Sequence, residues 1–187
     1  AVLIDGGFDA ANNHIRYWND ISFMYQTLNK TYGYPTDHIQ VLMSNGADNA
    51  TIDRHNWTYA DGSILMDKSP STFDNNTWGA EPEITANANE TTLGLAFQPQ
   101  LPGSKLGIPG GAAGKDIFVF TTGHGGLDSS GKLIYYLFDQ DYIKSQAFLN
   151  KLPADARSIT MVMQQCYSGG FALPFLTDTR LASVPIR

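Results

Sequence analysis

The residues best suited to chemistry in this chain of 187 residues are one histidine and the only cysteine. His124 follows the apolar run Asp116–Thr122 and has glycine on both sides, and Cys166 follows the apolar run Ser158–Gln164. Each run predicts a buried strand that ends just before a reactive side chain. A cysteine thiolate is a nucleophile and a histidine can take up its proton, so the two together are suited to covalent catalysis.

The residues next to this pair favour a reactive role over a structural one. A lone cysteine is most often an inert core thiol, but Cys166 is followed by Tyr167–Gly170, which predicts a loop. A thiol on a loop or at a helix N-terminus is accessible to a substrate. Glycines beside His124 allow a substrate backbone to approach closely, and the Gly125 N–H could stabilise an oxyanion.

The spacing of apolar residues predicts the elements that position this pair. A helix from about Asn13 to Tyr32 separates two short apolar runs, and this strand–helix–strand order predicts a parallel sheet. Ligand sites lie at the carboxyl ends of parallel strands, so we expect His124 and Cys166 to meet at one sheet edge. We therefore expect an α/β fold, with a mostly parallel sheet flanked by helices in three αβα layers. The expected core strands are Val2–Ile4, Ile39–Met43, Asp116–Thr122 and Ser158–Gln164.

The rest of the chain is less regular. Residues 44–114 are rich in Asn, Asp, Gly, Pro and Thr, which predicts an irregular insertion. The length of the chain predicts a single domain spanning residues 1–187. Further elements are expected at Thr85–Phe97 (helix), Leu133–Phe138 (strand), Asp141–Leu152 (helix) and Leu181–Pro185 (strand).

Composition and charge exclude several classes of protein. The net charge is −6 and the sequence has no basic block, so nucleic acid is not expected as a partner. No apolar stretch approaches the roughly 20 residues that span a bilayer. The few charges and the many Asn, Thr and Gly residues favour an exported protein. The chain begins inside an apolar run and without Met, so we expect a processed or trimmed product.

A metal site is not expected at the His–Cys pair, because neither residue has partners at zinc-ligand spacing. No other cofactor is expected. Aspartates within residues 44–114 could bind a structural calcium ion, although they also fit a solvated acidic loop, which is the commoner case. These aspartates are Asp48, Asp53, Asp61, Asp67 and Asp74.

The two motifs resemble those of the legumain-like cysteine peptidases, part of the wider caspase-like group. That family has an apolar strand ending in His-Gly and, further along, an apolar strand ending in Cys with a small Ser-Gly loop. Here the two motifs are Thr122–Gly125 and Gln165–Gly169. The opening segment is similar too, with Arg16, Asp20 and the pair Tyr25-Gln26 at the family's spacing.

The resemblance implies a caspase-like fold and an endopeptidase that uses a dyad of His124 and Cys166 on peptide or protein substrates. It also implies that Arg16 lines the pocket for the residue before the scissile bond. The alternative for Arg16 is an ion pair with Asp20, four residues on, at the helix surface.

The chain departs from the family pattern at three places. Legumains have an aspartate where this chain has Gly123, and a pocket glutamate where it has Gln164. They have an asparagine where this chain has His14, with Asn13 adjacent as a residue that could orient the catalytic histidine. A neutral Gln164 beside Arg16 predicts a polar or acidic residue before the cut, Asn or Asp.

Other functions stay open. The chain could be a degenerate peptidase domain that acts as a binding module, or a transpeptidase or ligase on the same fold. An α/β-hydrolase is disfavoured, because it needs a small residue two positions before the nucleophile, where Gln164 stands, and a histidine late in the chain. Residues 167–187 leave room for little more than one strand, so we expect a second chain or a missing C-terminal segment to complete the sheet.

Overall fold

A five-stranded parallel sheet forms the centre of the molecule. The computed structural model describes residues 1–9, 12–44, 46, 57–58, 64–65 and 83–187. The strand order across the sheet is β10-β6-β1-β2-β5, and each neighbouring pair is parallel. The mostly parallel sheet expected from the sequence is therefore confirmed. The strands are β1 (Val2–Asp5), β2 (Gln40–Met43), β5 (Ile84–Ala86), β6 (Asp116–Thr122) and β10 (Ser158–Met163).

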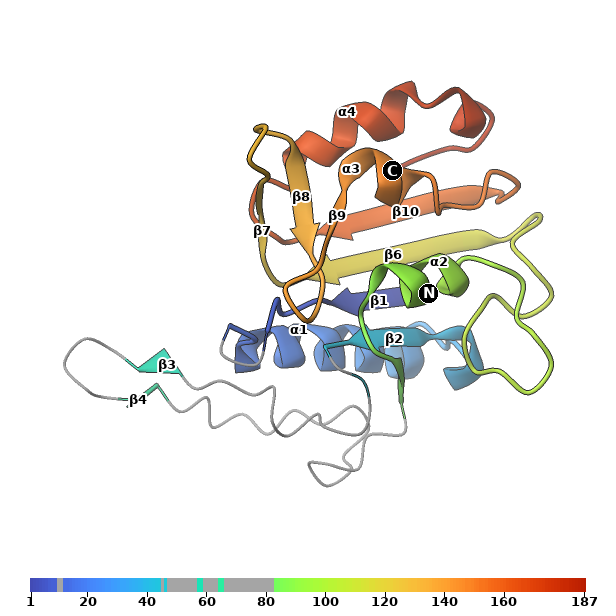
Figure 1. Cartoon of the computed structure of the whole chain (residues 1–187). Helices are drawn as coiled ribbons and strands as arrows, with labels where there is room; N and C mark the ends of the chain where they lie inside the picture. The colour runs from blue at the N-terminus through green and yellow to red at the C-terminus, as the bar shows by residue number, and fades with distance from the viewer. Residues whose placement is uncertain (10–11, 45, 47–56, 59–63, 66–82) are drawn as a thin grey trace.

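Strands β1 and β2 are buried along their whole length because helices cover both sheet faces. Helix α1 (Ile15–Gln26) connects β1 to β2 and continues into a π-helical turn, η1 (Thr27–Thr31). It packs on one face, where Trp18, Ile21 and Tyr25 lie with strand residues in one buried cluster. The opposite face is covered by α2 (Glu90–Ala96), α3 (Ser145–Leu149) and α4 (Gly169–Thr177). These layers give the three-layer α/β arrangement in Figure 1.

A small antiparallel sheet lies beside the carboxyl end of the main sheet. It consists of β7 (Gly125–Leu127), β8 (Leu133–Tyr136) and β9 (Tyr142–Lys144). The helix predicted over 141–152 is therefore only the five residues of α3. The residues before it alternate, with Ile143 buried between exposed Tyr142 and Lys144, which suits a half-buried strand.

The segment 44–114, expected to be irregular, contains regular elements among its described residues. Strand β5 belongs to the main sheet, and α2 begins at a capping box formed by Asn89 and Thr92. Two further residue pairs form a short antiparallel ladder, β3 (Trp57–Thr58) and β4 (Ile64–Leu65). Helix α2 was predicted over Thr85–Phe97, and the difference arises because residues 84–86 pair with β2.

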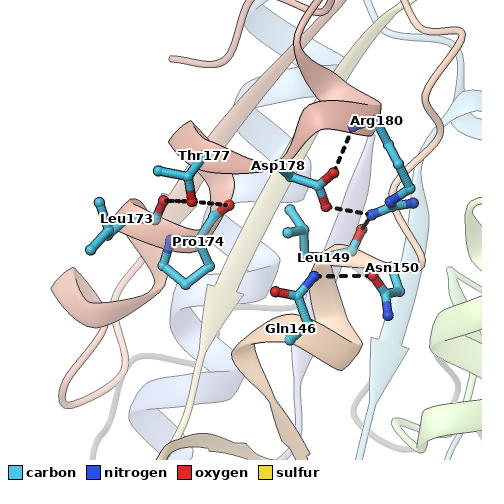
Figure 2. Close-up of polar contacts among 8 residues, drawn as sticks. All are labelled: Gln146, Leu149, Asn150, Leu173, Pro174, Thr177, Asp178 and Arg180. Atoms are coloured by element: carbon cyan, nitrogen blue, oxygen red, sulfur yellow. Dashed lines mark hydrogen bonds and ion pairs between the residues drawn. The ribbon is translucent and has the colours of Figure 1, made fainter.

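The C-terminal part of the chain is fixed on α3. Figure 2 shows the Arg180 guanidinium between Asp178 and the Leu149 carbonyl, with donor–acceptor distances of 2.8 and 3.0 Å. The Asp178 carboxylate also accepts from the Arg180 backbone N–H at the start of η4 (Thr179–Leu181). Residues 185–187 then run parallel to β10, and Ile159 N–H donates to the Pro185 carbonyl at 2.9 Å.

One tyrosine joins the small sheet to the two strands that carry the candidate site. Tyr135 of β8 is fully buried. Its hydroxyl oxygen lies 2.7 Å from the Thr122 carbonyl and 3.0 Å from the Ile4 carbonyl, and it accepts from the Gly6 N–H at 3.2 Å. Because these backbone groups end β6 and β1, a single hydroxyl ties together the carboxyl ends of both strands.

We expect Tyr135→Phe to lower the free energy of unfolding by about 1 to 3 kcal/mol, because buried backbone groups lose their partner. Urea unfolding measures the change. The matched control is Tyr142→Phe on neighbouring β9, whose side chain is 41% exposed, and it should change stability by less than about 0.5 kcal/mol. Equal stability of the wild type and Tyr135→Phe would contradict the role given to this hydroxyl.

Candidate active site

His124 and Cys166 lie just beyond the carboxyl ends of two neighbouring strands. Strands β6 and β10 pair directly, with Met163 opposite Thr121. The pairing continues one residue further, because Gln164 N–H donates to the Thr121 carbonyl at 2.9 Å. The two loops that follow therefore begin side by side at one sheet edge.

The loops after β6 and β10 are in contact at Gly125. A Cβ atom at Gly125 would lie 2.1 Å from the Cys166 carbonyl oxygen and 2.9 Å from Cγ of Gln165. No side chain fits into that gap, so the close approach requires glycine. The contact places the backbone next to His124 directly against the backbone of Cys166.

Cys166 lies in the turn that leads into α4, and its side chain is exposed. The next residue, Tyr167, has φ of 62°, a left-handed conformation that is uncommon for a residue with a Cβ. This turn separates the end of β10 from the first turn of α4. The thiol is thus free in this structure, reachable from solvent and close to a helix N-terminus.

The His124 ring is held by a backbone carbonyl. Its Nε2 lies 2.9 Å from the Asn12 carbonyl oxygen. A carbonyl only accepts, so this contact assigns the proton of the neutral ring to Nε2 and leaves the lone pair on Nδ1. A histidine whose Nδ1 carries the lone pair can accept the proton of a thiol.

The tyrosine next to Arg16 also contacts this ring. The Tyr17 hydroxyl lies 3.3 Å from Nε2 and 3.5 Å from Nδ1 of His124. The ring centroids of Tyr17 and His124 are 5.3 Å apart in an edge-to-face arrangement, and the His14 ring is 5.7 Å from that of His124. The start of α1 therefore packs three rings together at the site.

Arg16 lies at the edge of this cluster with its side chain exposed. Its Nη2 donates to the Tyr17 hydroxyl at 2.9 Å, and the guanidinium carbon is 4.8 Å from the Tyr17 ring centre. It forms no ion pair with Asp20 or with any other residue in the described part of the chain. Asp20 instead accepts from the Thr122 hydroxyl at 2.9 Å, and burial raises the pKa of its carboxyl.

The other two residues predicted for the site, Gln164 and Asn13, differ in their exposure. Gln164 is exposed, at the carboxyl end of β10 beside the site. Asn13 is buried, its amide donates to the Ser44 hydroxyl, and its side chain packs against Gly7. The group that contacts His124 is thus the carbonyl of Asn12, one residue earlier.

Several residues at the site were not anticipated from the sequence. Gln165 is buried beside Cys166, and its Oε1 accepts from the Thr121 hydroxyl at 2.6 Å. Asp5 is fully buried, and its Oδ1 would lie 3.0 Å from a Cβ at Gly123. Asp5 and Gln165 could have been found from the sequence, because each is a polar residue that ends or closely follows a buried strand. Tyr17 could have been found because it lies next to Arg16 on the same predicted helix.

Among the residues that the structure describes, no group of three or more His, Cys, Asp or Glu side chains could hold a metal ion. The five aspartates named as calcium candidates lie outside the described residues. In the same described ranges, no helix is long and apolar enough to cross a membrane. A scan against models of protein families and a search of curated proteins gave no match to the chain.

The contact at Gly125 makes a direct prediction. We expect Gly125→Ala to lower the free energy of unfolding by about 1 to 3 kcal/mol, because the added methyl group collides with the Cys166 carbonyl. We also expect it to change the rate at which iodoacetamide alkylates Cys166. The control is Gly169→Ala at the start of α4, where an added Cβ would meet no described residue within 4 Å apart from its chain neighbours and its own helix backbone. A Gly125→Ala protein as stable and as reactive as the wild type would show that the two loops are not tightly packed.

Proposed function

We propose that this chain is a cysteine endopeptidase of the legumain-like, caspase-like type, with His124 and Cys166 as its dyad. The observation that carries the proposal is that neighbouring parallel strands deliver both residues to one sheet edge, where Gly125 packs against the Cys166 carbonyl. The resemblance of the sequence motifs supports it. An exported location stays a prediction from composition.

In the proposed mechanism, Nδ1 of His124 takes the Cys166 proton, and the thiolate forms a bond to the carbonyl carbon of the substrate. The carbonyl electrons move to oxygen, which the Gly125 and Cys166 N–H groups stabilise. The C–N bond then breaks as His124 gives its proton to the leaving amine. A water molecule, deprotonated by His124, hydrolyses the thioester and restores the thiol.

In this proposal, Arg16 and Gln164 recognise the substrate residue before the cut. Arg16 is exposed and makes no ion pair among the described residues, so its guanidinium has donors available for a carboxylate or amide oxygen. Gln164 is exposed and neutral and can donate or accept. Together they suit Asp or Asn.

Two other functions differ from this one in what they require of the dyad. A binding module needs neither residue, yet the chain has both at one edge with an accessible thiol. A transpeptidase forms the same thioester and differs only in the amine that resolves it. When a second peptide with a free amino terminus is added, a transpeptidase joins it to the cleaved substrate, whereas a hydrolase releases the free acid. Mass spectrometry of the products therefore distinguishes ligation from hydrolysis.

The test uses fluorogenic peptides ending in Asn, Asp or Arg. We expect cleavage after Asn and Asp, and Cys166→Ala should lower turnover at least about 10,000-fold because the nucleophile is lost. Cleavage by Cys166→Ala at the wild-type rate would overturn the mechanism.

The same peptides test the pocket. Arg16→Ala should lower kcat/KM on the Asp peptide about 10- to 100-fold, since a hydrogen bond to a charged group contributes about 1.5 to 3 kcal/mol. Arg157→Ala is the control, because Arg157 forms an exposed ion pair with Asp116 at the opposite end of the strands. Efficient cleavage after Arg alone, unaffected by Arg16→Ala, would show that the pocket is elsewhere.

A further inference from the structure

We propose that Tyr17 is a positioning residue that links the substrate-binding Arg16 to the His124 ring. This inference rests on the proposed function and extends it to a residue that the sequence motifs do not single out. Tyr17 lies at the start of α1 and is 5% exposed, so its hydroxyl is held in one place by packing. That hydroxyl has Arg16 on one side and His124 on the other.

The donors and acceptors fix how the hydroxyl is used. Arg16 can only donate, so the Tyr17 oxygen accepts at 2.9 Å and its proton points elsewhere. Burial is the largest influence on Tyr17 and raises its pKa, so the hydroxyl keeps its proton at neutral pH. The Tyr17 oxygen lies 3.3 Å from Nε2 and 3.5 Å from Nδ1 of His124. Because the Nε2 proton faces the Asn12 carbonyl, Nδ1 is the ring nitrogen that can accept the Tyr17 proton.

This arrangement restrains His124 when the pocket is empty. The Tyr17 proton is directed at the lone pair that must take the thiol proton, which favours the neutral ring. When a substrate carboxylate or amide binds Arg16, the guanidinium leaves the Tyr17 oxygen. The hydroxyl can then rotate and accept from the protonated ring, so occupancy of the pocket favours the imidazolium form that the reaction needs.

The charge environment of the hydroxyl comes from several elements. Besides burial, charged neighbours also shift the pKa of Tyr17. Arg16 lowers this pKa, whereas the buried Asp5 and Cys166 raise it. Tyr135 of β8 is affected in turn by Tyr17. Among the described residues, the titratable or charged groups in ring or hydrogen-bond contact with Tyr17 are His14, Arg16 and His124. Those that interact with it electrostatically are Arg16, Asp5 of β1, Tyr135 of β8 and Cys166 after β10.

The test is Tyr17→Phe, which keeps the ring and removes the hydroxyl. We expect kcat on the Asp peptide to fall about tenfold, because the hydroxyl no longer accepts from the protonated His124 ring. KM should stay the same or fall, because the substrate no longer has to displace the Tyr17 oxygen from Arg16. Without peptide, the pH midpoint of Cys166 alkylation by iodoacetamide should move down by about 0.5 to 1 unit, since the restraint on His124 is gone. A purely structural role would slow both reactions together.

The control is Tyr25→Phe, which removes a buried hydroxyl from the same helix. Tyr25 lines a cavity with Thr36 and Ile39 at the amino end of β2, away from His124. The Tyr25→Phe variant should have the same kcat and the same alkylation midpoint as the wild type. In the double variant Arg16→Ala/Tyr17→Phe, the fall in kcat should be smaller than the product of the falls in the two single variants. The reason is that Arg16 acts on His124 through the Tyr17 hydroxyl, so the two effects are not independent.

The outcomes separate this inference from the proposed function. An unchanged kcat and an unchanged alkylation midpoint in Tyr17→Phe, beside a wild type that cleaves peptide, overturn the inference alone. Parallel falls in kcat and alkylation rate with a lower melting temperature also overturn it. If the wild type cleaves no peptide and His124→Ala alkylates with the wild-type midpoint, the proposed function fails and this inference fails with it.

Discussion

The candidate site depends on one close backbone contact, that of Gly125 with the carbonyl of Cys166. Parallel pairing of β6 and β10 brings the two loops to the same edge, but it does not fix their separation. The missing side chain at Gly125 allows the loops to meet, since a Cβ there would lie 2.1 Å from the Cys166 oxygen. His124 directly precedes Gly125, and α4 begins three residues after Cys166, so both lie next to that contact.

Around this contact, buried polar groups connect the elements that form the site. The Tyr135 hydroxyl joins the ends of β1 and β6, the Asn12 carbonyl contacts the His124 ring, and the Tyr17 hydroxyl lies between that ring and Arg16. Buried polar groups lower stability unless they are paired, so such a network restricts the site to few arrangements. This restriction is useful to a dyad whose members come from separate strands.

The sequence predicted the sheet well because its signal is simple. A short apolar run bounded by turn residues, such as Asp116–Thr122, favours a buried strand, and the observed strand has the same bounds. Elements that depend on pairing were harder to predict. Residues 142–144 join β8 as a strand where a helix was expected, and Ile84–Ala86 adds a fifth strand within a polar segment. The site residues named from motifs were those on the strand ends, whereas Tyr17 and Asn12 come to His124 only through the packing of α1.

The most direct test of the central claim is covalent labelling with a peptidyl acyloxymethyl ketone ending in Asp, followed by intact mass and peptide mapping. The account predicts one adduct per chain, on Cys166, and a labelling rate at least about 100-fold lower in His124→Ala, because the thiol then lacks its base. Equal labelling of the wild type and His124→Ala would contradict the account, because Cys166 would then react as an isolated surface thiol.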